Sequence, residues 1–69
     1  MKHKEIYSSF FSEDEWIDLL ILIENQKYIE AISFFRSNTG FNLIQGGKMI
    51  KLIAKEELDK DILTFIHND

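Results

Sequence analysis

Residues 28–43, YIEAISFFRSNTGFNL, carry the clearest structural signal in this sequence: a helical pattern stops at a glycine, and a capping residue follows. Gly40 suits the left-handed conformation just past a helix end, and Asn42 is a favoured N-cap residue for a new helix. The stretch therefore predicts a helix over residues 27–38, a turn, and a further helix. The residues that form its buried stripe share helical spacing; they are Tyr28, Ile32 and Phe35, with Ile29 and Ala31 beside them.

The helix after this turn is expected over residues 43–56. Its apolar face holds Leu43, Gly46, Gly47, Ile50 and Ile53. Each glycine costs about 1 kcal/mol relative to alanine in a helix interior. Two interpretations stay open: the glycines let another helix approach closely, or residues 43–47 form an irregular loop and the helix starts later.

The chain before residue 28 predicts one more long helix, over residues 12–24. Ser12 with Glu15 three residues later is the capping-box pattern, and acidic residues suit the first turn of a helix. The apolar residues at helical spacing are Trp16, Leu19, Leu20 and Ile23, and the face is widened by Ile17 and Ile21.

The two ends of the chain also contain apolar residues that are expected to pack. A short tail helix is expected over residues 58–67, from Leu58, Ile62, Phe65 and Ile66. Near the amino terminus, a staple or a short helical turn is expected from Ile6, Tyr7, Phe10 and Phe11. No alternating strand pattern is present, so the sequence predicts an all-α fold, a compact bundle of three to four short helices in one domain spanning residues 1–69.

Composition narrows the function classes. The chain has 69 residues, no cysteine, and 12 acidic against 8 basic residues, for a net charge of −4. An acidic chain is poorly suited to binding nucleic acid, whose phosphates need a basic surface. The longest apolar run, residues 19–23, is far shorter than the about 20 residues that span a bilayer. We expect a cytoplasmic protein, complete as given, with no membrane segment.

No residue set predicts catalysis or a cofactor. The sequence lacks a phosphate-binding glycine motif, and although serines are present, its two histidines lie at opposite ends of the chain. We therefore expect no enzyme activity, no cofactor and no metal. One metal pattern stays open, because a free amino terminus in Met1-Lys2-His3 has the donors of a square-planar Cu(II) or Ni(II) site.

Charge and aromatic patterns favour a protein partner. Lys48, Lys51 and Lys55 form one basic ridge if their helix is regular, and Arg36 extends it. We expect this ridge to dock an acidic protein, with Phe34 and Phe41 as hydrophobic anchors. An ordinary solvated helix face is the other interpretation of the same lysines.

Two further functions stay open. The acidic cluster of Glu13, Asp14, Glu15 and Asp18 has the charge of an immunity-type inhibitor that neutralises a basic toxin, although helix capping explains part of it. Nine aromatic residues, six of them Phe, exceed what a minimal helical core requires. An exposed apolar surface of that kind suits a structural homodimer that buries the first helix.

Residues 28–43 resemble the helix-turn segment in the C-terminal domain of the bacterial ribosomal stalk protein, and that of small uncharacterised bacterial proteins with the same module. Arg36, Thr39, Gly40 and Leu43 match the family pattern, and Phe41 replaces a leucine. The resemblance implies a bacterial protein with a helical face that docks translational GTPase factors. Ser33 stands where the family has lysine, and residues 44–47 stand where it has Lys-Glu-Ala-Lys. The β-strands of the stalk domain have no counterpart in this sequence.

Overall fold

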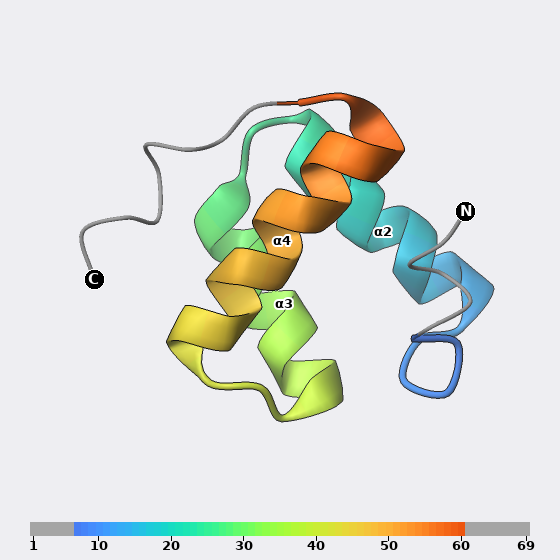
Figure 1. Ribbon diagram of the computed structural model, residues 1–69. Coiled ribbons are helices and arrows are strands. Elements are labelled where there is room, and N and C mark those ends of the chain that lie inside the picture. Colours follow the sequence, from blue (N-terminus) through green and yellow to red (C-terminus); the bar gives the residue numbers. More distant parts are fainter. Residues whose placement is uncertain (1–6, 61–69) are drawn as a thin grey trace.

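The computed structural model describes residues 7–60, which form three packed helices after a short turn (Figure 1). They are α2 (Glu13–Glu24), α3 (Tyr28–Thr39) and α4 (Leu43–Leu58). Each helix contacts both of the others, and α4 lies across α2 and α3. No strand occurs within the described residues. The predicted all-α bundle is confirmed.

Helix α2 begins where the capping-box pattern predicted. The Glu15 backbone N–H donates to Ser12 Oγ at 3.1 Å, and the Ser12 backbone N–H donates to Glu15 Oε1 at 2.9 Å. These two bonds satisfy amide groups that have no partner inside the first helical turn. The helix ends at Glu24, and Gln26 then takes a positive φ of 62° in the turn to α3.

The turn between α3 and α4 also forms as the sequence indicated. Gly40 has φ of 83°, and its N–H donates to the Arg36 carbonyl at 2.8 Å. Asn42 then caps α4, because its Oδ1 accepts from the Gln45 N–H at 2.8 Å, and Gln45 Oε1 accepts in return from the Asn42 N–H at 3.3 Å. Helices α3 and α4 are therefore joined by a tight turn, after which α4 crosses over α3 (Figure 1).

Gly46 and Gly47 lie inside α4 and are buried, which decides between the two interpretations of this pair. A Cβ placed on Gly46 would lie 2.9 Å from Arg36 Cγ and 3.4 Å from Ile32 Cγ2. The absence of a side chain at Gly46 lets α4 pack directly against α3, so this glycine serves close approach, and the helix does not start late.

The core is built from residues of all three helices and closed by the amino-terminal turn. Its largest fully buried side chains are Trp16, Phe35, Leu19, Ile23, Ile50 and Ile53. The Tyr7 ring lies edge-on to Phe35 at 5.3 Å, and the Phe11 ring lies 5.7 Å from both Trp16 and Phe35. The N–H groups of Phe10 and Phe11 donate to the Tyr7 carbonyl, which makes the predicted short turn.

Three parts of the sequence-based description differ from the structure. Ile29 and Leu43 were expected on buried faces, but both are exposed: Ile29 lies about 120° around α3 from the buried Phe35, and Leu43 is the first residue of α4. Helix α4 continues to Leu58, two residues beyond its predicted end, and Asp59 then adopts the left-handed conformation with φ of 56°. The predicted fourth helix consequently cannot begin at residue 58; its remainder from residue 61, like Ile6, lies outside the described residues.

Candidate protein-binding surface

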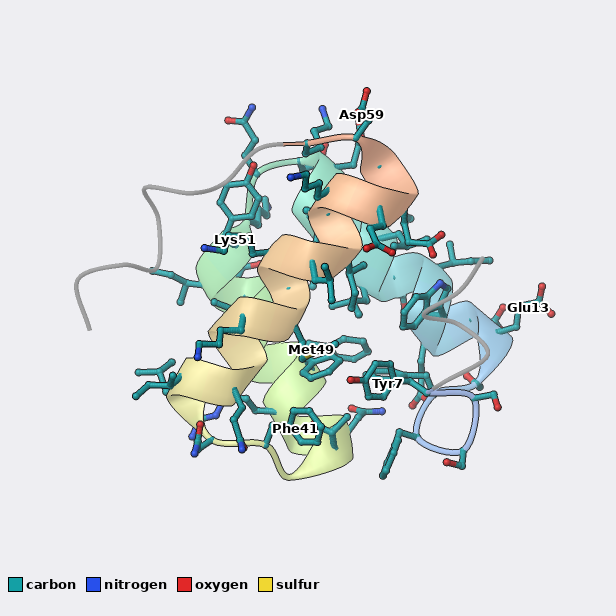
Figure 2. The ribbon with its side chains drawn as sticks, in the orientation of Figure 1. Tyr7, Glu13, Phe41, Met49, Lys51 and Asp59 are labelled. Carbon is teal, nitrogen blue, oxygen red and sulfur yellow. The ribbon has the colours of Figure 1, made fainter. Side chains whose placement is uncertain are left out.

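Because α4 is continuous, it displays its three lysines on one side. At about 100° per residue, Ile44, Lys48, Lys51 and Lys55 fall within an arc of about 60°, and Leu52 lies next to it. Ile44 is 55% exposed and Leu52 is 40% exposed, and no other described helix covers them. Figure 2 shows Lys51 on the side of α4 away from Tyr7 and Met49. We call the surface formed by these five residues, Ile44, Lys48, Lys51, Leu52 and Lys55, the basic face.

Ile44 and Leu52 were missed as candidate site residues in the sequence. The signal was present, since Ile44, Lys48 and Leu52 follow one another at intervals of four and therefore share a side of a regular helix. It became visible only once Gly46 and Gly47 were known to be helical. These two aliphatic side chains, Ile44 before the lysines and Leu52 among them, give the basic face an apolar component that lysines alone lack.

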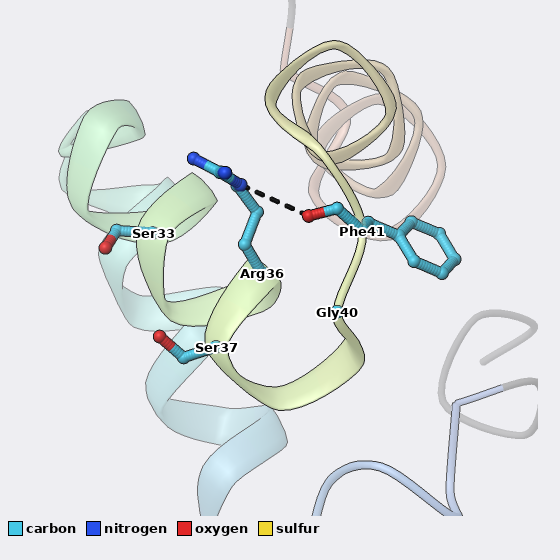
Figure 3. A pocket seen from close by; sticks show the side chains of 5 residues that line it. All are labelled: Ser33, Arg36, Ser37, Gly40 and Phe41. Atoms are coloured by element: carbon cyan, nitrogen blue, oxygen red, sulfur yellow. Dashed lines mark hydrogen bonds between the residues drawn. The ribbon is translucent and has the colours of Figure 1, made fainter.

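Arg36 lies beside the start of the basic face, and two contacts hold its side chain in place. Its aliphatic stem packs on Gly46, two residues before Lys48. Its Nε–H donates to the Phe41 carbonyl at 3.2 Å (Figure 3). A guanidinium fixed through Nε keeps its two terminal nitrogens for a second, forked contact of the kind that a carboxylate accepts. Arg36 thus lies at the α3 edge of α4, and its role in binding a partner stays a prediction.

An open hollow of about 340 Å³ adjoins the Arg36 side chain. Its wall is formed by the α3–α4 corner, from Ser33, Arg36, Ser37, Gly40 and Phe41 (Figure 3). The two serine side chains stand one helical turn apart on α3, so two hydroxyl groups line the hollow together with the guanidinium. The hollow is therefore polar on its α3 side and suits an acidic side chain better than an apolar one.

The two predicted aromatic anchors are already partly used by the core. The Phe34 ring lies 5.9 Å from Phe11, and the Phe41 ring lies 5.4 Å from Phe35 and 6.1 Å from Tyr7. Both side chains are half-buried. Less of their area is free for a partner than an exposed aromatic would offer, so Ile44 and Leu52 are the larger apolar contribution to this surface.

The acidic cluster lies on the other side of the molecule. Glu15 is engaged in the α2 capping box, while Glu13, Asp14 and Asp18 are exposed. Figure 2 places Glu13 and Lys51 at opposite edges of the fold. The structure therefore does not bring the two predicted sets of partner-binding residues together; they form separate surfaces of opposite charge.

Other chemistry within residues 7–60 is sparse. No group of three or more His, Cys, Asp or Glu side chains in this part of the chain is placed to hold a metal ion. The Met1-Lys2-His3 pattern lies outside the described residues. Burial raises the pKa of the Tyr7 hydroxyl above its ordinary value of 10.0. No helix in the same region is long and apolar enough to cross a membrane.

Comparisons with known proteins give no relative for this chain: no family model, no curated protein and no solved structure matches it. The resemblance of residues 28–43 to the ribosomal stalk domain stays a prediction.

Proposed function

We propose that this protein acts by binding another protein, without catalysis, and that the basic face of α4 docks an acidic surface of that partner. The observation that carries this proposal is the continuity of α4 through Gly46 and Gly47, which places the exposed Ile44 on the same side as the three lysines of the basic face, with the exposed Leu52 beside them. An unbroken charged-and-apolar helix face of this kind is typical of protein recognition.

The two kinds of side chain have different tasks in this interaction. Exposed ion pairs contribute about 0–1 kcal/mol each, so the lysines mainly steer and orient the partner. Ile44 and Leu52 supply apolar area at about 25 cal/mol per Å² removed from water. Arg36 adds a forked contact at the end of the face. We place the interaction in the cytoplasm, as the sequence predicts, and the stalk-like resemblance implies that the partner is a translation factor.

Charge reversal tests the proposal. We expect Lys48→Glu to weaken capture of an acidic partner from source-cell lysate by about ten-fold, because it removes one attraction and adds one repulsion. Lys27→Glu, at an exposed site in the turn before α3, is the matched control and should leave capture unchanged. The same loss should appear for the wild-type protein at high salt. Equal capture by the wild-type and Lys48→Glu proteins would contradict the proposal.

A second candidate is immunity-type inhibition of a basic toxin through α2. The observation that favours it is the exposure of Asp14 and Asp18 beside Ile17 and Ile21 on the outer side of that helix. In this case neutralising Asp14 and Asp18 should abolish capture of a basic partner, while Lys48→Glu should have no effect. The two sets of variants therefore assign the function to one helix or the other.

A further inference from the structure

The outer face of α2 is the counterpart of the basic face of α4. Asp14, Ile17, Asp18 and Ile21 fall within an arc of about 100° on this helix. Ile17 is 46% exposed and Ile21 is 50% exposed, and nothing in residues 7–60 packs over them. Helix α2 contains no basic residue at all. We call these four residues the acidic face.

The two faces match in both charge and apolar content. Each has two exposed aliphatic side chains on one helix, with charged residues of a single sign among them. On the acidic face the aliphatic side chains are one turn apart, and on the basic face Ile44 and Leu52 bracket Lys48. Two helices laid side by side in this way can pair aliphatic with aliphatic and carboxylate with ammonium, as paired amphipathic helices do.

These faces cannot meet within one molecule. Both lie on the outer sides of their helices, and Glu13 and Lys51, which mark the two helices in Figure 2, stand at opposite edges of the fold. A contact between them must therefore join two copies of the chain. Because it uses two different surfaces, it is a head-to-tail contact, which leaves one free face of each kind at the ends.

We propose that the basic face of one copy binds the acidic face of a second copy, so that the protein associates head to tail. This inference rests on the proposed function and gives the same surface a second copy of the chain as its acidic partner, in place of the translation factor that the resemblance implies. The contact involves about one helix from each copy and therefore buries less surface than the about 1,200 Å² of a standard stable interface. The association is consequently weak. The net charge of −4 on each copy also opposes it. The free faces at each end allow further copies to add.

Two variants, each with one altered face, test the geometry. Asp18→Lys with Ile21→Ser removes the acidic face and keeps the basic face. Lys48→Glu with Leu52→Ser removes the basic face and keeps the acidic face. All four side chains are exposed, so both variants should keep the wild-type circular dichroism spectrum. Matched charge controls are Glu30→Lys and Lys27→Glu, at exposed sites on neither face.

Sedimentation velocity at low salt over a series of protein concentrations gives the readout. We expect the mean mass of the wild-type protein and both controls to rise with concentration beyond that of a dimer. Each altered variant alone should remain a monomer, because its association weakens at least about ten-fold. An equimolar mixture of the two should form a one-to-one dimer that grows no further, since each contributes its single intact face.

Three results would overturn the inference. They are a wild-type protein that is monomeric at every concentration, self-association that neither variant disturbs, and a mixture of the variants that stays monomeric although the wild-type protein associates. None of these decides the proposed function. If Lys48→Glu still loses an acidic partner that Lys27→Glu retains, the basic face binds a different protein and only the head-to-tail contact is wrong.

Discussion

Gly46 shows how a single residue connects the fold to the candidate surface. A helix-interior glycine is unfavourable by itself, yet here it gives the Arg36 stem room to lie across α4. The same packing positions the guanidinium, whose Nε–H reaches the Phe41 carbonyl. Gly40 is different, since an added Cβ would contact nothing within 4 Å, and its φ of 83° is the reason for glycine there.

A double-mutant cycle at Gly46 and Arg36 checks this account. In the wild-type background, the helix-propensity gain of Gly46→Ala, about 1 kcal/mol, is offset by displacement of the Arg36 stem. In an Arg36→Ala background the clash with Cγ is absent, so Gly46→Ala should become more stabilising by about 0.5–1 kcal/mol. Urea unfolding of the four proteins measures both steps. Identical effects of Gly46→Ala in both backgrounds would show that Arg36 does not require the glycine.

At the scale of elements, caps determine the starts of α2 and α4, which each begin with a complete capping box. Helix α3 begins at Tyr28, and its N-cap residue, Lys27, makes no side-chain cap hydrogen bond. Helix α3 compensates through burial, because Ala31, Ile32 and Phe35 all face the core. Helix α4 depends more on its cap, since its first turn contains the exposed Leu43 and Ile44.

We therefore expect Asn42→Ala to lower the free energy of unfolding by about 1 kcal/mol, the usual value of a lost N-cap. Asn42→Asp keeps an acceptor for the Gln45 N–H and adds a favourable charge at the helix start, so its stability should equal or exceed that of the wild-type protein. Chemical denaturation compares the three proteins. If Asn42→Asp is as unstable as Asn42→Ala, the hydrogen bond to Gln45 is not the stabilising feature.

At the scale of the whole molecule, the amino-terminal turn completes the core. Tyr7 contacts Phe35 of α3 and Phe41 of the α3–α4 turn, and Asn38 Nδ2 donates to the Phe10 carbonyl at 3.1 Å. At the other end of the bundle, Lys60 pairs with Glu24 at 3.2 Å. The helices are thus tied together by segments at both ends, which leaves the outer sides of α2 and α4 as the oppositely charged surfaces.

Because Tyr7 is buried, the free energy of unfolding should depend on pH in the alkaline range. Because burial raises its pKa in the folded state above 10.0, the folded protein holds this proton more tightly than the unfolded chain does. The stability that it contributes is complete below about pH 10 and is lost as the pH rises through the folded-state pKa. Tyr7→Phe keeps the ring and removes the ionisation.

Free energies of unfolding on both sides of about pH 10 test this dependence. The wild-type protein should lose more stability than Tyr7→Phe as the pH rises, because only the wild-type protein has the buried Tyr7 hydroxyl. Parallel curves for the two proteins would mean that the Tyr7 hydroxyl ionises equally well in the folded and unfolded states.

The sequence by itself determined where α2 begins, where α3 ends to within one residue, and where α4 begins. Ser12, Gly40 and Asn42 act on backbone groups within about four residues, so their chemistry can be read without knowing what lies across the core. The same locality explains why the all-α class and the bundle were predicted correctly, since helical spacing is a property of each segment alone.

Only the tertiary structure decided which apolar residues are buried and whether the basic face exists. Ile29 and Ile32 are equally apolar, but Ile32 faces α4 and Ile29 faces solvent. Gly46 and Gly47 are unfavourable in an isolated helix, and Gly46 becomes suitable because Arg36 and Ile32 pack against it in the first turn of α4. That long-range contact keeps α4 unbroken and thereby places Ile44 on the side of the three lysines, because packing energy from a neighbouring helix exceeds the local cost of two glycines.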